Sequence, residues 1–120
     1  MTEVSAPIAR RLPKPAELAE LEASAAAAAR LMKLMASEQR LIILCHLGEG
    51  ECSVGELAQH VGLAQSACSQ HLAKLRAEQV VGTRREGQTI YYRLTDPAAV
   101  RVIDTLCDIY RGKPAPKPAA

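Results

Sequence analysis

The sequence predicts a mainly α-helical domain that carries one β-hairpin within a chain of 120 residues. Two short amphipathic helices joined by a tight turn are indicated over residues 53–75, and a strand, a turn and a second strand follow over residues 80–94. Trp and Phe are absent, so aliphatic side chains must fill the core. A helix pair followed directly by a hairpin is typical of the winged helix-turn-helix, and we expect the order α-α-α-α-β-β-α.

Two helices are expected before the turn motif. The first runs from about Ala16 to Met35, and the second runs from an N-cap at Ser37 to about Leu47. Along the first helix, apolar residues recur at the alternating spacing of a coiled-coil seam. These residues are Leu18, Leu21, Ala25, Ala28, Met32 and Met35.

The helix-turn-helix begins at a capping box, in which Ser53 caps the helix and Glu56 stands three residues later. Gly62 ends this helix, because glycine enters the left-handed backbone region without a steric penalty. The next helix has one apolar side, which contains Leu63, Cys68, Leu72 and Leu75. Its other side carries small polar residues, which suit a helix that lies in the major groove of DNA. The alternative is an ordinary amphipathic helix pair in an all-α domain.

The hairpin over residues 80–94 favours the first of these interpretations. Residues 90–94 follow the period of a half-buried strand, and Glu86-Gly87 supplies the turn. Arg84 and Arg85 stand just before the tip, where their guanidinium groups can reach phosphates or an adjacent minor groove. A basic wing directly after a polar helix predicts a protein that binds double-stranded DNA.

The helix and the wing together predict a set of DNA contacts. Ser66, Ser69 and Gln70 are expected to read base edges, whereas basic side chains hold phosphates. His71 lies at the border of the helix, where packing or a phosphate contact is expected. The predicted contacts are Gln65, Ser66, Ser69, Gln70, His71, Lys74, Arg84, Arg85 and Gln88. The scarcity of aromatic residues argues against single-stranded nucleic acid, whose bases stack on aromatic rings.

The last expected helix opens at Asp96-Pro97, an N-cap followed by a proline at the first helical position. The residues expected to point inward are Val100, Ile103, Leu106, Cys107 and Tyr110. One copy of the chain leaves the apolar faces of the first and last helices without enough to pack against. We therefore expect these helices to pair in a homodimer. The alternative is that they pack on each other within one protomer.

The folded domain is expected to span residues 15–111. Residues 1–14 and 112–120 are rich in Ala, Pro and basic residues without periodicity, and we expect both to be disordered tails. Neither tail resembles a signal peptide, and no stretch could span a membrane, so we expect a cytoplasmic location. In that compartment the four cysteines are not expected to form a disulfide framework.

Several runs of residues carry a resemblance to a known family. They are SEQRLIILCHL at residues 37–47, QSACSQHLAKLR at residues 65–76 and RREGQTIYYRL at residues 84–94. Residues 16–111 as a whole resemble the ArsR/SmtB family of bacterial repressors. The resemblance is closest to the branch that responds to reactive sulfur species or oxidants. It implies a homodimer formed through the first and last helices, and it implies a palindromic operator.

In that branch two cysteines act as the redox-sensing pair, and this chain departs from the pattern at one of them. Cys45 matches the first cysteine, but Arg111 occupies the second position, after Tyr110. Cys107 lies one turn earlier on the same helix face, about 5.4 Å along the axis. The sensing pair is therefore shifted to Cys45 and Cys107, or it is lost. A further departure is Ala64, where the family usually places a serine that caps the helix.

Each cysteine also has a purely structural interpretation, since free cysteine is often a small buried hydrophobe. For Cys68, on the apolar stripe, we favour that interpretation. Cys45 shares an apolar helix face with Leu41 and Leu44. For Cys45 and for Cys107, packing and sensing are both open. Cys52 is expected in a loop, as an exposed thiol.

A metal- or metalloid-responsive repressor is the main alternative, because many members of the family bind zinc, cadmium or arsenite. Their Cys-x-Cys pair corresponds here to Ser53 and Gly55, and the last helix contains no histidine. His46, His60 and His71 lie on separate elements, so local spacing assembles no four-ligand site and we expect no metal and no cofactor.

Two other classes of protein fit the sequence less well. A thiol enzyme is disfavoured, since no Cys-x-x-Cys is present and nothing marks a substrate cleft. A helical adaptor that binds only protein would leave the basic wing unexplained. The sequence therefore predicts a DNA-binding transcriptional repressor. A small reactive sulfur or oxidant inducer is expected to cross-link its cysteines within one chain, directly or through a short sulfur chain, and to release the operator.

Overall fold

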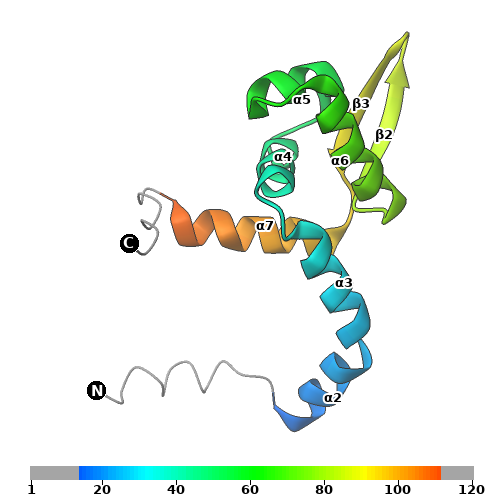
Figure 1. The fold of residues 1–120 in the computed structure, drawn as a ribbon. Helices are drawn as coiled ribbons and strands as arrows, with labels where there is room; N and C mark the ends of the chain where they lie inside the picture. The colour runs from blue at the N-terminus through cyan, green and yellow to red at the C-terminus, as the bar shows by residue number, and fades with distance from the viewer. Residues whose placement is uncertain (1–13, 112–120) are drawn as a thin grey trace. The chain divides into compact units, whose positions relative to one another are not determined.

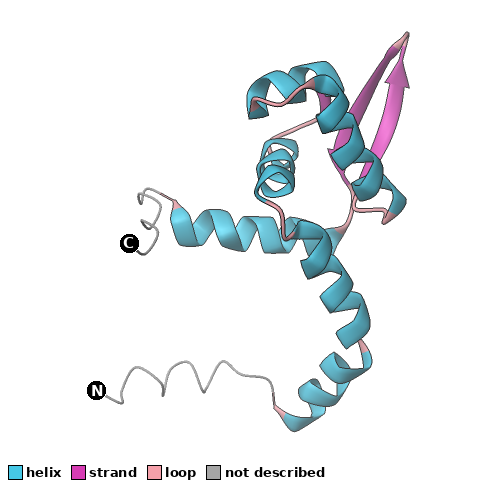
Figure 2. Ribbon diagram, viewed as in Figure 1, coloured by secondary structure: helices cyan, strands magenta, loops and turns pink. Residues whose placement is uncertain are grey.

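The computed structural model describes residues 14–111. The two expected tails, residues 1–14 and 112–120, lie outside this range apart from Lys14. The chain contains two compact units, one that ends at Lys33 and one that begins at Leu34. Helices make up most of the described chain, and one small sheet belongs to the second unit (Figure 1 and Figure 2). None of the described helices is long and apolar enough to cross a membrane.

The first unit is built from α2 (Pro15–Ala23) and most of α3 (Ala25–Met35). The sequence predicts one continuous helix here, but Ser24 interrupts it with φ −104° and ψ 7°. A serine side chain competes for backbone hydrogen bonds, so serine favours helix ends over helix interiors. The predicted apolar seam is exposed in the single chain except for its last residue, Met35, which is buried; the exposed residues are Leu18, Leu21, Ala25, Ala28 and Met32.

Helix α4 (Glu38–Gly48) is the centre of the core in the second unit. It packs against α5 (Val54–Val61), α7 (Pro97–Tyr110) and strand β3 (Thr89–Leu94). Its buried side chains are Ile43, Leu44 and Leu47. The serine predicted as the N-cap does cap the helix, since its Oγ accepts a hydrogen bond from the backbone N–H three residues later at 3.3 Å. Because this cap fixes the residue at which α4 begins, α4 sets the positions of the elements that pack on it.

The predicted helix-turn-helix is formed by α5 and α6 (Gln65–Ala77). Its capping box is confirmed: the Glu56 N–H donates to Ser53 Oγ at 3.3 Å, and the Ser53 N–H donates to the Glu56 carboxylate at 3.2 Å. Gly62 ends α5 in the left-handed region, with φ 72°. Ala64 is the N-cap of α6 and makes no side-chain cap bond. The first turn of α6 therefore lacks the bond that a serine there would supply.

The hairpin belongs to a three-stranded antiparallel sheet in the order β1-β3-β2. Strands β1 (Cys52–Ser53) and β2 (Val81–Glu86) flank β3, and β2 pairs with β3 along its whole length. The turn consists of Gly87 and Gln88 rather than Glu86 and Gly87, and Gly87 has φ 63°. The sequence gives no indication of β1, because two residues are too few to show an alternating pattern.

Helix α7 begins as predicted, since the Asp96 carboxylate accepts a hydrogen bond from the Ala98 N–H at 2.9 Å. The predicted inward face is only partly buried. Ile103 is buried against the core, and Leu106 is half-buried. The exposed members of that face are Val100, Cys107 and Tyr110. The C-terminal part of α7, where Cys107 and Tyr110 lie, extends past α4 (Figure 1).

Gly62→Ala is expected to destabilise the fold, because Gly62 adopts a backbone conformation in which alanine is strained. The expected cost is about 1 kcal/mol. It is a cost of backbone strain alone, since a Cβ there meets no atom within 4 Å. Urea unfolding at equilibrium measures the loss.

Gly48→Ala is the matched control for this substitution. Gly48 lies at the end of α4, and a Cβ there sits at ordinary contact distance, 3.8 Å from Leu94 and 3.9 Å from Ile103. Alanine favours the helix over glycine, so we expect a gain of about 0.5 kcal/mol. If the free energy of unfolding rose in both variants or fell in both, the assigned backbone conformations would be contradicted.

Candidate nucleic-acid interface and thiol pocket

Helix α6 separates its polar and apolar residues onto two sides. The buried side consists of Cys68, Leu72 and Leu75, each with no exposed surface (0%). The predicted DNA contacts on the other side are exposed, and they are Gln65, Ser66, Ser69, Gln70 and Lys74. Their spacing places them along one stripe of the helix. The helix therefore presents short polar side chains on a surface that can enter a major groove.

His71 stands at the edge of this stripe and is half-buried. Burial lowers the pKa of His71, and the nearby charges of Arg40 and Lys74 lower that pKa further. Arg40 belongs to α4, and its Nε is buried with no hydrogen-bond partner among residues 14–111. The sequence gives no sign of this proximity of Arg40 to His71, because the two residues belong to different helices. The three side chains form a basic cluster beside α6, where a phosphate oxygen would be stabilised.

The two wing arginines project from opposite faces of the hairpin, because neighbouring side chains alternate along a strand. Arg84 is paired with Tyr91, and Arg85 is paired with Ile90. Arg85 is exposed, and no carboxylate of the described residues lies within ion-pair distance of it. Gln88, in the turn, is exposed as well. At the wing tip, the guanidinium group of Arg85 is therefore available to bind an anion.

Arg84 has a different environment. Its Nε lies 2.7 Å from Glu51 Oε1, and its Nη1 lies 2.8 Å from Glu86 Oε1. The guanidinium carbon lies 4.7 Å from the centre of the Tyr91 ring, within the range of a cation–π contact. The hydrogen bonds to Glu86 and Glu51 raise the pKa of Arg84 above its ordinary value. The structure thus brings Arg84 to the wing as predicted but engages it with acidic neighbours.

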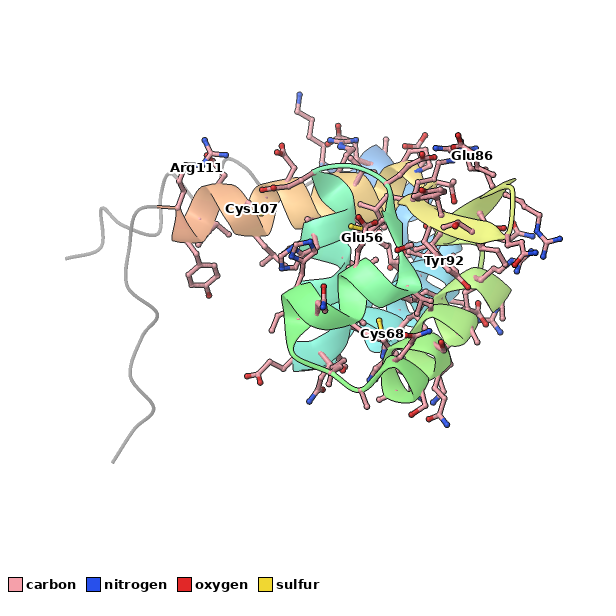
Figure 3. The ribbon with its side chains drawn as sticks, turned by 90° about the horizontal axis from the view of Figure 1, so that it is seen from above. Glu56, Cys68, Glu86, Tyr92, Cys107 and Arg111 are labelled. Atoms are coloured by element: carbon pink, nitrogen blue, oxygen red, sulfur yellow. The ribbon has the colours of Figure 1, made fainter. Side chains whose placement is uncertain are left out.

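The predicted thiol pair lies where α4 meets α7. Cys45 and Cys107 line one pocket of about 190 Å³, together with Glu49 and Arg111. Neither cysteine forms a disulfide; Cys45 is half-buried and Cys107 is exposed. Burial raises the pKa of Cys45, and the charge of Cys107, a hydrogen bond with Cys107 and the charge of Glu49 raise it further. The two thiols are therefore neighbours. Cys107 and Arg111 follow one another along the last turns of α7 (Figure 3).

The other two cysteines are less accessible than Cys107. Cys68 is fully buried, and burial raises its pKa. Cys52 is expected in a loop, but it lies in β1 opposite Tyr92 and is half-buried. Burial and the charge of Glu56 raise the pKa of Cys52. Because the thiolate is the reactive form, these environments slow the reactions of both cysteines at neutral pH.

Two of the histidines come together although they lie on separate elements. The imidazole rings of His46 in α4 and His60 in α5 stack, with centroids 5.3 Å apart and planes at 14°. Their spacing in the sequence gives no sign of this contact, which depends on how α5 packs on α4. Across the part of the chain that the structure describes, no group of three or more His, Cys, Asp or Glu side chains could hold a metal ion.

Comparisons with known proteins point to regulators of transcription. Residues 37–82 match the family described as bacterial regulatory protein, arsR family. The transcriptional activator HlyU of Vibrio cholerae serotype O1 is 47% identical over 96 residues, which cover 80% of this chain and 89% of HlyU. The curated relatives that match in this way are regulators, not enzymes.

Two solved structures share the fold. Reduced HlyU from Vibrio cholerae superposes with a TM-score of 0.73 at 47% identity, covering 77% of this chain and 97% of that one. The transcriptional repressor BigR from Xylella fastidiosa superposes with a TM-score of 0.73 at 39% identity, covering 78% and 96% of the two chains. The expected winged helix-turn-helix is therefore confirmed for the greater part of the described residues.

Alkylation of the thiols tests the geometry of the pocket without DNA. At neutral pH we expect iodoacetamide to label Cys107 first, Cys45 more slowly and Cys68 only after unfolding. Cys107→Ala should shift the pH midpoint of Cys45 labelling downward, because the charge and hydrogen bond of Cys107 raise the pKa of Cys45. Peptide mass spectrometry across a pH series measures the midpoint. Cys68→Ala is the control, and an unchanged midpoint in Cys107→Ala would contradict the contact.

Proposed function

The chain belongs to the arsR family of bacterial regulatory proteins, and we propose that this transcriptional regulator is a repressor that binds operator DNA as a homodimer. One observation carries the proposal: α6 exposes a polar stripe beside a wing whose Arg85 is exposed and without an acidic partner in residues 14–111. A protein that acts on chromosomal DNA in this way works in the cytoplasm.

In the proposed complex, α6 lies in the major groove. Ser66, Ser69 and Gln70 read base edges, since hydroxyl and amide groups match the donor and acceptor pattern exposed there. The basic cluster of Arg40, His71 and Lys74 binds phosphates at the edge of the groove. Gln65 contacts the duplex from the first turn of α6, and Arg85 with Gln88 reaches the backbone or the adjacent minor groove from the wing.

The homodimer accounts for apolar surface that one chain leaves exposed. On α2 and α3 that surface includes Leu18, Leu21 and Met32, and on α7 it includes Val100, Ile109 and Tyr110. We infer that these helices pair across a two-fold axis, because a closed symmetric interface buries the same patch on both copies. Two copies of α6 would then meet successive major grooves about 34 Å apart, which requires a palindromic operator.

The proposed switch is chemical modification of Cys45 and Cys107. The exposed Cys107 thiolate attacks the outer sulfur of a small persulfide, takes that sulfur and releases the remaining thiolate of the small molecule. The Cys45 thiolate then attacks Cys107 Sγ, forms a disulfide and expels hydrogen sulfide. With hydrogen peroxide the same pair gives the disulfide and two waters. In both reactions the inducer is reduced while the two protein thiols are oxidised.

A cross-link between Cys45 and Cys107 would fix α7 to α4. Because α7 belongs to the proposed dimer interface, fixing it changes the separation of the two α6 helices. A coupling free energy of about 1–3 kcal/mol lowers DNA affinity about 5- to 150-fold, which is enough to release a repressor. The neighbouring positions of the two thiols in one pocket support this proposal.

Substitutions in α6 and the wing should affect DNA binding in two distinct ways. The probe is a duplex that the wild-type protein selects from a random library, with a scrambled duplex as the reference. Gln70→Ala should reduce the preference for the selected duplex about 5- to 150-fold, the value of one lost base-specific contact. Arg85→Ala should weaken binding to both duplexes and lower the salt slope by about one unit.

Gln59→Ala provides the control for these variants, because Gln59 is exposed on α5, outside the α6 stripe. It should leave affinity and preference unchanged. If Gln70→Ala keeps the full preference while Arg85→Ala keeps the wild-type salt slope, neither α6 nor the wing is the DNA-binding surface.

The thiol switch is tested by substituting the two cysteines singly. Reduced wild-type protein should bind the selected duplex and lose affinity after treatment with glutathione persulfide. Cys45→Ser and Cys107→Ser should bind the duplex when reduced and keep that affinity after treatment, because neither can form the cross-link. Intact-mass measurement on the same samples should give the disulfide in the wild type alone.

Cys68→Ser should respond to persulfide as the wild type does, since Cys68 is buried away from the pocket. A chelator should leave the operator affinity unchanged. Release of DNA by persulfide in both single variants would exclude Cys45 and Cys107 as the pair. Loss of affinity on adding zinc, reversed by the chelator, would instead favour a metal-responsive repressor.

A further inference from the structure

Arg84 lies on a face of the sheet that is separate from the face packed on the core. Along β2, Val81 and Arg85 share one face, whereas Arg84 shares the other with Glu86. Val81 is buried, which identifies its face as the inner one. On the outer face Arg84 stands beside its partner Tyr91 from β3. Two neighbouring arginines of the wing therefore face different surroundings.

The outer face holds a closed group of charges. Arg84 bonds to Glu51 at 2.7 Å and to Glu86 at 2.8 Å, and its guanidinium lies over Tyr91. Arg93 approaches the second oxygen of Glu51 at 4.0 Å. Two arginines and two glutamates cancel, so this group has no net charge to offer to a phosphate. For Arg84 to bind a phosphate, it would have to leave two carboxylates that then repel the same DNA.

The partners of Arg84 come from two parts of the fold. Glu86 is the last residue of β2, next to the turn at the wing tip. Glu51 stands just before β1, in the segment that follows α4. Because β1 pairs with β3 over only two residues, Cys52 and Ser53, the backbone ties this segment to the wing weakly. The contact between Glu51 and Arg84 spans 33 positions in the sequence and adds a side-chain tie across the sheet.

We propose that Arg84 is a positioning residue that holds the wing in its DNA-binding direction through Glu51 and Glu86, while Arg85 makes the phosphate contact. The proposal rests on the DNA-binding function proposed above. The sequence predicts that Arg84 and Arg85 both bind DNA, whereas this proposal gives wing positioning to Arg84 and phosphate binding to Arg85. The planar guanidinium suits this position, since it can bond to two carboxylates while its face lies on an aromatic ring.

Glu51→Gln distinguishes the two possible roles of Arg84 by the sign of its effect. If Arg84 holds the wing, loss of the Glu51 contact loosens the wing and weakens binding to the selected duplex about two- to five-fold, as expected for an exposed ion pair. The comparison is made at a salt concentration that screens the net positive charge that the substitution leaves on the wing. If Arg84 binds phosphate, the same substitution removes a competing anion and strengthens binding. Circular dichroism and thermal melting establish that each variant is folded.

The salt dependence provides a second readout. Arg84→Gln should weaken binding about two- to five-fold and leave the salt slope unchanged, whereas Arg85→Gln should lower the slope by about one unit. The double variant Glu51→Gln/Arg84→Gln should bind as Arg84→Gln alone does, because both substitutions break the same contact. Arg84→Lys should restore only part of the affinity, since lysine lacks the planar fork.

Hydrogen exchange without DNA keeps this proposal separate from the proposed function. Amides of β2 and β3 near the tip should exchange faster in Glu51→Gln and Arg84→Gln than in the wild type, and Arg85→Gln should leave them unchanged. Stronger DNA binding by Glu51→Gln, a lower salt slope in Arg84→Gln or unchanged exchange in both would overturn the positioning role. If exchange changes as expected but the wild type binds no duplex, the DNA-binding function fails and the positioning role of Arg84 for DNA fails with it.

Discussion

Burial of one face of α4 is the constraint on which the second unit depends. Ile43 and Leu44 have no exposed surface, and α5, α7 and β3 all pack on this helix. Apolar surface removed from water is worth about 25 cal/mol per Å², so these contacts supply much of the free energy that fixes the neighbouring elements. The same helix reaches both functional regions, because Arg40 approaches His71 of α6 and Cys45 approaches Cys107 of α7. A change at the thiol pocket or at the basic cluster therefore affects α4, which contributes residues to both.

Local chemistry explains which parts of the fold could be predicted from the sequence. The capping box at Ser53, the left-handed Gly62 and the alternation along β3 each depend on residues a few positions apart, and each pattern leaves a readable spacing. The break at Ser24 was not readable, since the apolar seam continues through it and serine is tolerated inside helices. Strand β1 exists only because β3 is present to pair with it. Its two residues carry no pattern of their own.

The candidate sites divide in the same way. The exposed stripe of α6 follows from helical periodicity, so its residues could be named from the sequence. The ion pair of Arg84 with Glu51 could not, because the two residues are 33 positions apart in the sequence and only the folded sheet brings them together. The stacking of His46 on His60 and the approach of Arg40 to His71 likewise depend on how α4 packs. Cys107 lies one helical turn before position 111, where related repressors are expected to carry the second cysteine. It is still close to Cys45, since Cys107 and Cys45 line the same pocket.

In the proposed complex α6 reads the bases, Arg85 binds phosphate and Arg84 positions the wing. A crystal structure of the reduced protein with its selected duplex tests this assignment most directly. We expect a two-fold dimer with both α6 helices in successive major grooves, Arg85 on the DNA backbone and Arg84 still bonded to Glu51 and Glu86. A duplex that contacts a surface other than α6, or an Arg84 that has left both glutamates for a phosphate, would contradict the account.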